Sequence, residues 1–385
     1  MTYWVTFAII LFFALKGVNY KHDKSTHRCL MYMWAIMTLF QGLRWNTGAD
    51  WLQYYITFEQ SSWTNIFTYT RGLQGRYMEP GYMFINVLIK TFFFHYTFFL
   101  LITCGFISYT YLRFVERFVP ERKTLAYALV LVMMTIFPVR QVLACAFFFW
   151  AIPYILDRNW KRYFILVAVA YSIHYSCFIL VFFYWLDRAF NRYILTMFYF
   201  MSSAIAMVIP SAIQKIASLP ILKGLAAQDL AVRYYSQMEK AVTAVDKAGL
   251  NNSVSIAFVI VQIWIYASFR DRIQDEKYRK FVSFMINLFV IASTARQIAL
   301  LPGLSEMNRF GYYCGIAMPI LMVCAVNFYS KHEMKRYAQL LYCFLILMYF
   351  FKVNSIFQGL YVHLYEPYYF VFEDSPVRDS WFYFH

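Results

Sequence analysis

Charged residues are scarce in this chain of 385 residues, where they make up 14% against about 25% in an ordinary soluble domain. Hydrophobic residues make up 61%. Apolar runs of roughly 15–20 residues recur between charged clusters, which is typical of a helical protein with many membrane spans. Runs such as 124–137 and 254–269 are continuously apolar, unlike the alternating segments of about ten residues in a β-barrel. The sequence therefore predicts an all-α polytopic integral membrane protein.

Patterns that bind metals or nucleotides are also missing from the sequence. The seven cysteines form no CxxC pair and the seven histidines show no metal-ligand spacing, so we expect no metal and no cofactor. No Walker A, GxGxxG, GxSxG, HExxH or EF-hand pattern occurs. Nucleotide chemistry and soluble-type hydrolysis therefore have no support in the sequence.

Acidic residues number only 20 against 35 Lys and Arg, which gives a net charge of +15. Of the basic residues, 21 lie in six short loops: 16–28, 113–123, 157–162, 187–192, 270–280 and 331–336. Excess Lys and Arg in short loops marks the cytoplasmic side of a membrane protein. The basic balance thus predicts topology and contact with the lipid bilayer, and no nucleic-acid partner.

Placing these loops inside predicts about twelve spans in a single membrane domain over 1–385. The outer segments are then 44–80, 211–250 and the tail 354–385. The first run, 3–18, has no basic region before it and no cleavage site after it, so we interpret it as a span. Two stretches do not fit single spans. Residues 81–94 are predicted to be re-entrant or to lie at the interface, and 163–186 to form two half-helices with His174 near their outer apex.

Segment 44–55 joins a cation, a glycine turn, a carboxylate and aromatic residues at the point where a predicted span leaves the bilayer. Charges at such a boundary are costly and indicate a functional site. Gly48 lets the backbone bend between Arg44 and Asp50. Outer aromatic residues such as Tyr54 belong to the interfacial aromatic belt or stack on sugar rings. The segment suits an anionic, hydroxyl-rich substrate.

The positive-inside rule does not explain Arg44, Arg140, Arg296 and Arg309, which lie in predicted outer turns or within a span. The planar guanidinium fork suits phosphate and pyrophosphate oxygens. Either these arginines converge as a clamp for a lipid-linked pyrophosphate, or each pairs with a local acid or extends to lipid head groups.

Three residues are candidates for acid–base chemistry. Asp50 is the preferred general base, because it lies closest to the predicted membrane exit. Glu79 precedes Pro80-Gly81 at a predicted helix start, where its charge serves the site or merely favours the helix dipole. His174 lies at a predicted helix break, as a satisfied core histidine or a functional group.

Taken together, these segments resemble the Wzy-type, EpsG-like polysaccharide polymerases of bacterial envelopes. The matching segments are Arg44…Gly48-Ala49-Asp50-Trp51…Tyr54, Glu79-Pro80-Gly81-Tyr82, Arg140-Gln141-Val142-Leu143-Ala144, His174-Tyr175-Ser176, Arg309-Phe310-Gly311-Tyr312-Tyr313 and Glu366-Pro367-Tyr368-Tyr369. They follow one another over nearly the whole chain. Ala49 departs from the Gly-Thr-Asp expected in the family, although a small residue still fits the turn.

The resemblance implies a GT-C-like membrane glycosyltransferase. Such an enzyme polymerises oligosaccharide repeat units of O-antigen, capsule or exopolysaccharide, carried on undecaprenyl pyrophosphate, at the outer (periplasmic) face of the bacterial inner membrane. It implies no metal requirement, and a chain-length regulator (co-polymerase) as a protein partner. An acceptor hydroxyl attacks the anomeric carbon of the donor chain and the lipid pyrophosphate leaves, which requires a base and cations.

The resemblance also implies roles for particular residues. We expect Asp50 or His174 to be the base, and Arg140 and Arg309 to stabilise the pyrophosphate. The residues expected to bind substrate are Arg44, Gln141, Glu79, Arg296, Tyr54 and Tyr312.

Three other functions remain open. A flippase for lipid-linked sugars should show pseudo-repeats in its two halves, and none is visible. A sugar O-acyltransferase would use His174 as a base but would need few pyrophosphate-binding arginines. An O-antigen ligase uses the same donor with a lipid A acceptor, and the sequence separates it poorly from a polymerase.

Overall fold

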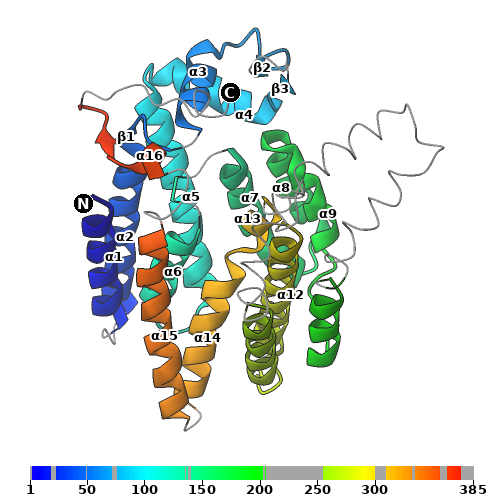
Figure 1. Ribbon diagram of the computed structural model, residues 1–385. Helices are drawn as coiled ribbons and strands as arrows, with labels where there is room; N and C mark the ends of the chain where they lie inside the picture. Colours follow the sequence, from blue (N-terminus) through cyan, green and yellow to red (C-terminus); the bar gives the residue numbers. More distant parts are fainter. Residues whose placement is uncertain are drawn as a thin grey trace, which may run out of the picture. The chain divides into compact units, whose positions relative to one another are not determined.

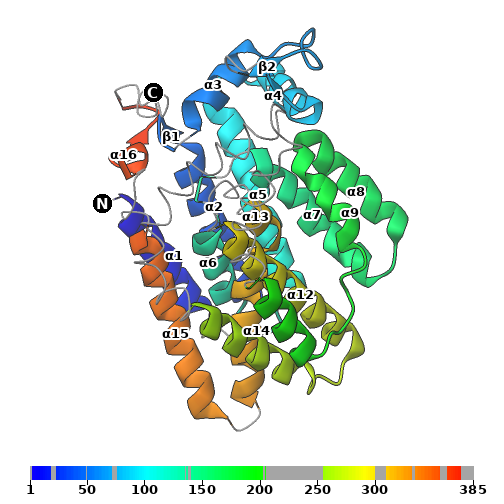
Figure 2. The same ribbon diagram turned by 45° about the vertical axis from the view of Figure 1, so that its right-hand side comes forward.

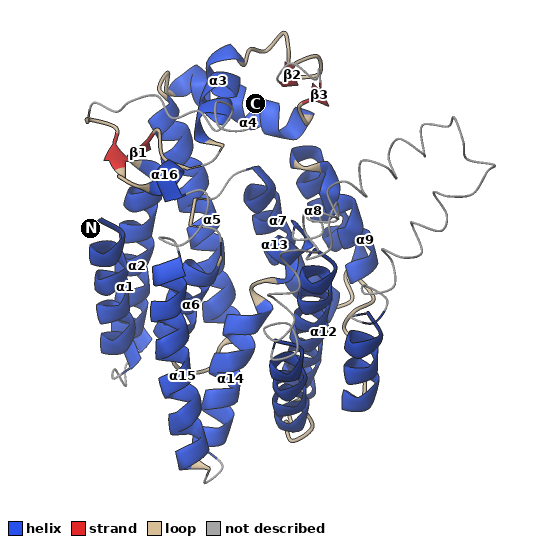
Figure 3. Ribbon diagram, viewed as in Figure 1, coloured by secondary structure: helices blue, strands red, loops and turns tan. Residues whose placement is uncertain are grey.

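The computed structural model shows a chain that is helical over most of its described length, with only short strands (Figure 3). It describes residues 2–18, 23–48, 50–71, 76–134, 136–137, 140–202, 204, 255–299, 309–331, 334–355 and 362–373. The predicted outer segment 211–250 lies outside these residues, as does part of the predicted outer tail 354–385. The predicted all-α class is confirmed for the described part of the chain.

The chain divides into two compact units, one formed by Met1–Trp185 with Met322–His385 and the other by Leu186–Leu321. The helices of the first unit are α1 (Thr2–Val18), α2 (Asp23–Gly42), α3 (Trp51–Gln60), α4 (Pro80–Phe92), α5 (Tyr96–Phe118), α6 (Lys123–Met133), α7 (Arg140–Leu156), α8 (Trp160–Ile173), the 3-10 helix η1 (Tyr175–Ile179), α9 (Leu180–Phe183), α15 (Lys335–Asn354) and α16 (Val362–Tyr365). Its strands are β1 (Arg44–Trp45), β2 (Thr70–Arg71), β3 (Arg76–Tyr77) and β4 (Tyr369–Phe370).

Helix α6 forms the centre of the first unit (Figure 1). Every residue from Thr124 to Val132 is buried, and α1, α2, α5 and α15 pack against it. A helix that is apolar on all sides belongs in the interior of a bundle. At 11 residues it extends only about 17 Å, so packing on every side holds it in place.

Polar contacts and one glycine join α1 to its neighbours. Thr124 Oγ1 donates to the Ala14 carbonyl at 2.7 Å, which joins α6 to α1. The Tyr349 hydroxyl donates to the Phe7 carbonyl at 2.6 Å, which joins α15 to α1. A Cβ at Gly17 would lie 2.4 Å from Thr124 Cγ2, so glycine allows this close approach. Small residues and interhelical hydrogen bonds are what hold membrane helices together.

The basic loops of the first unit meet at one end of the bundle. Lys123, at the start of α6, pairs with Asp23 at the start of α2 at 3.4 Å. Lys331, the last residue of α14 (Ala317–Lys331), pairs with Glu121 between α5 and α6 at 2.7 Å. Asp157, between α7 and α8, lies 3.9 Å from an arginine of α5. Four of the six predicted inner loops therefore share one end, as the predicted topology requires.

The opposite end of the first unit carries short elements that form a cap (Figures 1 and 2). Strand β1 follows α2 and pairs antiparallel with β4, so that Arg44 lies opposite Phe370 and Trp45 opposite Tyr369. Lys90 of α4 donates to the carbonyl of Glu59 near the end of α3. The cap thus joins segments from both ends of the chain.

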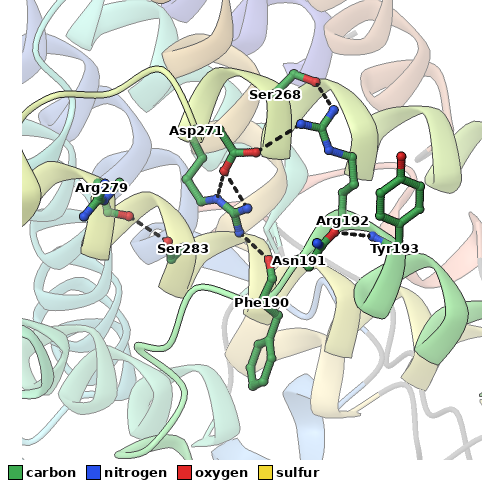
Figure 4. Close-up of polar contacts among 9 residues, drawn as sticks. Phe190, Asn191, Arg192, Tyr193, Ser268, Asp271, Arg279 and Ser283 are labelled. Atoms are coloured by element: carbon green, nitrogen blue, oxygen red, sulfur yellow. Dashed lines mark hydrogen bonds and ion pairs between the residues drawn. The ribbon is translucent and has the colours of Figure 1, made fainter.

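The second unit contains a helix over 192–202, the helix Ser255–Arg270, α12 (Glu276–Ala299), α13 (Phe310–Cys314) and the beginning of α14. Arg270 donates twice to the carboxylate of Asp271, at 2.9 and 2.7 Å. Arg192 reaches the same carboxylate at 3.2 Å (Figure 4). One acid therefore pairs with two arginines, and the predicted inner loops 187–192 and 270–280 lie together.

Four described helices are long and apolar enough to cross a membrane: Tyr96–Phe118, Glu276–Ala299, Phe310–Lys331 and Lys335–Asn354. Shorter apolar helices among the described residues are Thr2–Val18, Lys123–Met133, Arg140–Leu156 and Ser255–Arg270. These helices support a membrane protein. The total of about twelve spans and the GT-C-like arrangement stay predictions.

The structure describes both stretches, 81–94 and 163–186, that the sequence analysis predicted not to be single spans. Helix α4 has 13 residues and ends before α5 begins, so 81–94 is not part of the following span. Helix α8 ends at Ile173, and η1 and α9 follow. The Tyr163 hydroxyl donates to the Leu180 carbonyl at 2.5 Å, so the returning segment lies beside α8. The predicted helix break at His174 is confirmed.

Candidate functional site

Three segments that the sequence singled out meet at the capped end of the first unit. Arg140, the first residue of α7, forms an ion pair with Glu79, the residue before α4. The other oxygen of the Glu79 carboxylate accepts a hydrogen bond from the backbone N–H of Tyr175 at 3.3 Å. Glu79 is only 5% exposed. These contacts bring together Glu79-Pro-Gly-Tyr82, Arg140-Gln and His174-Tyr-Ser.

The guanidinium of Arg140 is only partly satisfied by these contacts. Its Nη1 donates to Glu79 and lies 2.6 Å from the sulfur of Met78, and its Cζ lies 6.0 Å from the centre of the Tyr82 ring. Its Nε is buried and has no hydrogen-bond partner among the residues that the structure describes. An unpaired buried donor costs roughly 1–3 kcal/mol, so this N–H is suited to an oxygen of a bound anion.

The local sequence explains why Glu79 is held at this point. It is the N-cap residue of α4, with Pro80 in the first turn, where the fixed φ of proline suits a helix start. A Cβ at Gly81 would lie 2.2 Å from Ser172 Oγ and 2.7 Å from the Ser172 carbonyl oxygen. Glycine therefore allows α4 to begin against the end of α8. The Glu79 side chain makes no capping hydrogen bond to its own helix. Its role is therefore defined by the ion pair with Arg140, in addition to any effect of its charge on the helix dipole.

His174 lies in the break between α8 and η1 and is 8% exposed. Its Nδ1 accepts from the backbone N–H of Ser176 at 3.3 Å and lies 2.6 Å from the Ser176 hydroxyl. A backbone N–H can only donate, so Nδ1 is the acceptor and the neutral ring carries its proton on Nε2. In this tautomer the histidine is a hydrogen-bond donor at Nε2.

Two buried tyrosines connect the Arg140 cluster to α3. The rings of Tyr54 and Tyr82 meet edge to face with their centres 5.7 Å apart. Tyr54 lies one helical turn after Asp50, the N-cap residue of α3, and its N–H donates to the Asp50 carbonyl at 3.2 Å. Asp50 is exposed, and its side chain does not cap the helix. The predicted base therefore lies accessible at the same end of the unit as Arg140.

Arg44 is buried beneath the turn that joins α2 to α3. It is 3% exposed, its Nη1 donates to the Gln41 carbonyl at 3.2 Å, and its Cζ lies 4.7 Å from the centre of the Phe137 ring. Among the described residues, its Nε has no hydrogen-bond partner and no carboxylate pairs with it. A buried cation without a counter-charge is costly. Gly48 has a φ of 111°, which confirms the predicted glycine turn and leaves Arg44 buried and Asp50 exposed.

The tail packs against the Arg44 turn. Tyr369 pairs with Trp45 between β4 and β1. The Tyr368 ring stacks on Phe40 with the centres 5.0 Å apart, and its hydroxyl donates to the Phe40 carbonyl. Burial raises the pKa of the Tyr368 hydroxyl, an effect that nearby Arg44 opposes. The hydroxyl therefore stays protonated, and Tyr368 serves packing instead of an exposed sugar platform.

Phe137 is a neighbour of the site that the sequence analysis did not single out. Besides facing Arg44, its ring stacks on Tyr365 with the centres 5.7 Å apart. It lies three residues before Arg140, so it links the Arg44 turn to the start of α7. The available signal was its place beside residues 138–141, because the predicted topology puts an outer tip there, between the spans 124–138 and 141–156. Gln141, next to Arg140, is buried at 9% exposure.

The remaining candidates belong to the second unit. Arg296 is exposed in the last turn of α12. Arg309 is exposed at the start of α13, and Tyr312 is half-buried within it. Helix α13 packs against α12. Convergence of all four arginines on one site therefore stays a prediction. Within the described residues, no group of three or more His, Cys, Asp or Glu side chains could hold a metal ion.

Apolar helices long enough to span a bilayer, together with a buried polar cluster at one end and basic loops at the other, define a helical membrane protein. The family model for the EpsG family matches residues 27–370. The chain therefore belongs to the EpsG family of polysaccharide-polymerase-like proteins, and the resemblance found in the sequence is confirmed. No curated protein and no solved structure matched this chain.

Proposed function

We propose that this protein is a glycosyltransferase of the bacterial inner membrane that polymerises oligosaccharide repeat units carried on undecaprenyl pyrophosphate. Membership of the EpsG family supports a polymerase-like role. The observation that carries the proposal is the buried cluster of Glu79, Arg140 and the Tyr175 backbone. The cluster contains Arg140, whose buried Nε–H has no hydrogen-bond partner among the described residues. It lies at the end of the unit opposite the basic loops. The positive-inside rule assigns that end to the outer side.

In this proposal Arg140 binds the pyrophosphate leaving group. Glu79 holds the guanidinium in place before substrate arrives, and the remaining N–H groups of the planar fork take phosphate oxygens. His174, with its proton on Nε2, donates a further hydrogen bond. Donors fixed in advance stabilise the charge that develops as the pyrophosphate leaves. Guanidinium charge would thus replace the divalent cation of metal-dependent glycosyltransferases.

The reaction joins two lipid-linked chains. The hydroxyl of the acceptor unit forms a bond to the anomeric carbon of the donor chain, the bond from that carbon to the pyrophosphate oxygen breaks, and a base takes the hydroxyl proton. We assign the base to Asp50, because Nδ1 of His174 already accepts from Ser176. Arg44 and Gln141 beside the cluster, with Arg296, Arg309 and Tyr312 of the second unit, remain proposed substrate contacts. A chain-length regulator is a proposed partner.

The test uses the full chain in nanodiscs with the lipid-linked repeat unit of its own host, without nucleotide sugar or added metal. The proposal expects a ladder of longer glycans on a gel, lost in Arg140→Gln and kept in Lys335→Gln, a variant at the exposed first residue of α15 at the opposite end. Transfer of a chain to lipid A alone would indicate a ligase. Movement of the lipid-linked unit across a liposome membrane without bond formation would indicate a flippase and overturn the proposal.

A further inference from the structure

A charged cavity lies at the basic end of the first unit, away from the cluster around Arg140. Its volume is about 410 Å³, and the start of α2, the end of α5 and the first residue of α6 form it. The 20 residues of α2, about 30 Å of helix, separate this cavity from the Arg44 turn. Its basic lining residues are Lys24, His27, Arg28 and Lys123.

The two acids that line the cavity already have partners. Asp23 pairs with Lys123 at 3.4 Å, and Glu116 contacts neighbouring histidine and arginine side chains at 2.6 and 2.9 Å. Lys24 and Arg28 form no ion pair with any residue that the structure describes. Being four residues apart on α2, they lie on one face of the helix.

Helix stability does not explain these two cations. The first turn of a helix favours acidic side chains and disfavours basic ones, yet Lys24 stands in the first turn of α2, and Arg28 follows in the second. The positive-inside rule explains basic residues at this end of the protein. It does not explain why two of them share one cavity in which every acid is already paired.

We propose that this cavity binds a phosphate-bearing anion at the inner surface of the membrane, held by Lys24 and Arg28. Arginine can take two phosphate oxygens with its fork, and lysine adds a compact charge. The volume lies within the range of small-molecule sites. Leu30 also lines the cavity. The proposal does not depend on the polymerase reaction.

Two kinds of ligand carry this phosphate chemistry: an anionic phospholipid head group and a free phosphate. The first arm titrates the purified full chain in detergent with phosphatidylglycerol and with phosphatidylcholine, and native mass spectrometry counts the lipids retained. The second arm measures thermal unfolding in phosphatidylcholine nanodiscs with inorganic phosphate or pyrophosphate. The test variant is Lys24→Gln/Arg28→Gln. The matched control is Lys335→Gln/Arg336→Gln, which removes the same charge from exposed residues outside the cavity.

We expect the wild-type chain to retain phosphatidylglycerol in preference to phosphatidylcholine. The affinity for phosphatidylglycerol should fall on the order of 30-fold in the test variant and stay within about twofold of wild type in the control. A phosphate-dependent rise in melting temperature that needs Lys24 and Arg28, without phosphatidylglycerol preference, would support the site with a free anion as its ligand. Equal losses in both double variants would show a general effect of net charge and overturn the proposal. So would the absence of both phosphatidylglycerol preference and a phosphate-dependent shift.

Discussion

Replacing Gly81 by alanine is the smallest change that should pull Glu79 away from its partners. The added Cβ would lie 2.2 Å from the Ser172 hydroxyl, 2.7 Å from the Ser172 carbonyl oxygen and 2.8 Å from its carbon. The hydroxyl can rotate away, but the carbonyl belongs to the backbone of α8. Helices α4 and α8 must therefore move apart by about 0.7 Å to restore the 3.4 Å at which ordinary contact begins.

This displacement predicts losses of both stability and activity. Overpacking of a close contact costs about 1–3 kcal/mol of unfolding free energy. Glu79 lies two residues before Gly81, and Tyr175 lies three residues after Ser172, so the shift acts directly on the hydrogen bond between them. A misplacement approaching 1 Å costs on the order of 100-fold in catalysis. We expect the polymerisation rate to fall by about that factor.

Chemical denaturation and the glycan ladder assay measure the two effects, and two further variants test the reasoning. Gly81→Ala/Ser172→Ala should not recover, because the carbonyl remains in place after the hydroxyl is removed. Gly311→Ala should keep wild-type stability, because no described atom outside its own helix backbone lies within 4 Å of the added Cβ. Wild-type stability and activity in Gly81→Ala, or rescue by Ser172→Ala, would refute the close approach of α4 and α8 as the basis of the site.

Other substitutions test single contacts of the same region. Arg140→Gln should lower the unfolding free energy by about 3 kcal/mol, since it leaves Glu79 buried and unpaired; denaturation measures the change. Asp50→Asn should slow polymerisation at least about 100-fold if Asp50 is the base, with stability within about 0.5 kcal/mol because the side chain is exposed. Tyr368→Phe should cost about 1 kcal/mol in thermal unfolding, since it removes the hydrogen bond to the Phe40 carbonyl.

Each of these expectations has a result that contradicts it. The double variant Arg140→Met/Glu79→Met should be more stable than Arg140→Gln, because no buried charge is left alone; equal instability would exclude the ion pair as the cause. Full polymerisation by Asp50→Asn would remove it from the base role. An unchanged melting temperature in Tyr368→Phe would mean that the hydroxyl adds nothing to the packing of the tail.

The helical class, the inner loops and the break at His174 could be predicted because each depends on local composition. Apolar runs of a given length predict helices, and an excess of Lys and Arg predicts the loops of one side. The break followed from the number of membrane crossings. A single span over 163–186 would have placed every later loop on the wrong side of the membrane. The structure confirms the break where α8 ends. The buried state of Arg44 was not predictable in this way, because Phe137, which covers it, is distant in the sequence.

The sequence by itself determined which residues are candidates, since it alone shows that Arg44, Glu79, Arg140 and His174 interrupt apolar segments where charge is expensive. Only the tertiary structure decided which of them meet. Glu79 reaches Arg140 and the segment after His174 because Gly81 lets α4 begin against α8, and Arg44 is buried against the Phe137 ring. Such contacts depend on how helices distant in the chain pack, and hydropathy and charge patterns report only the neighbours of each residue along the chain.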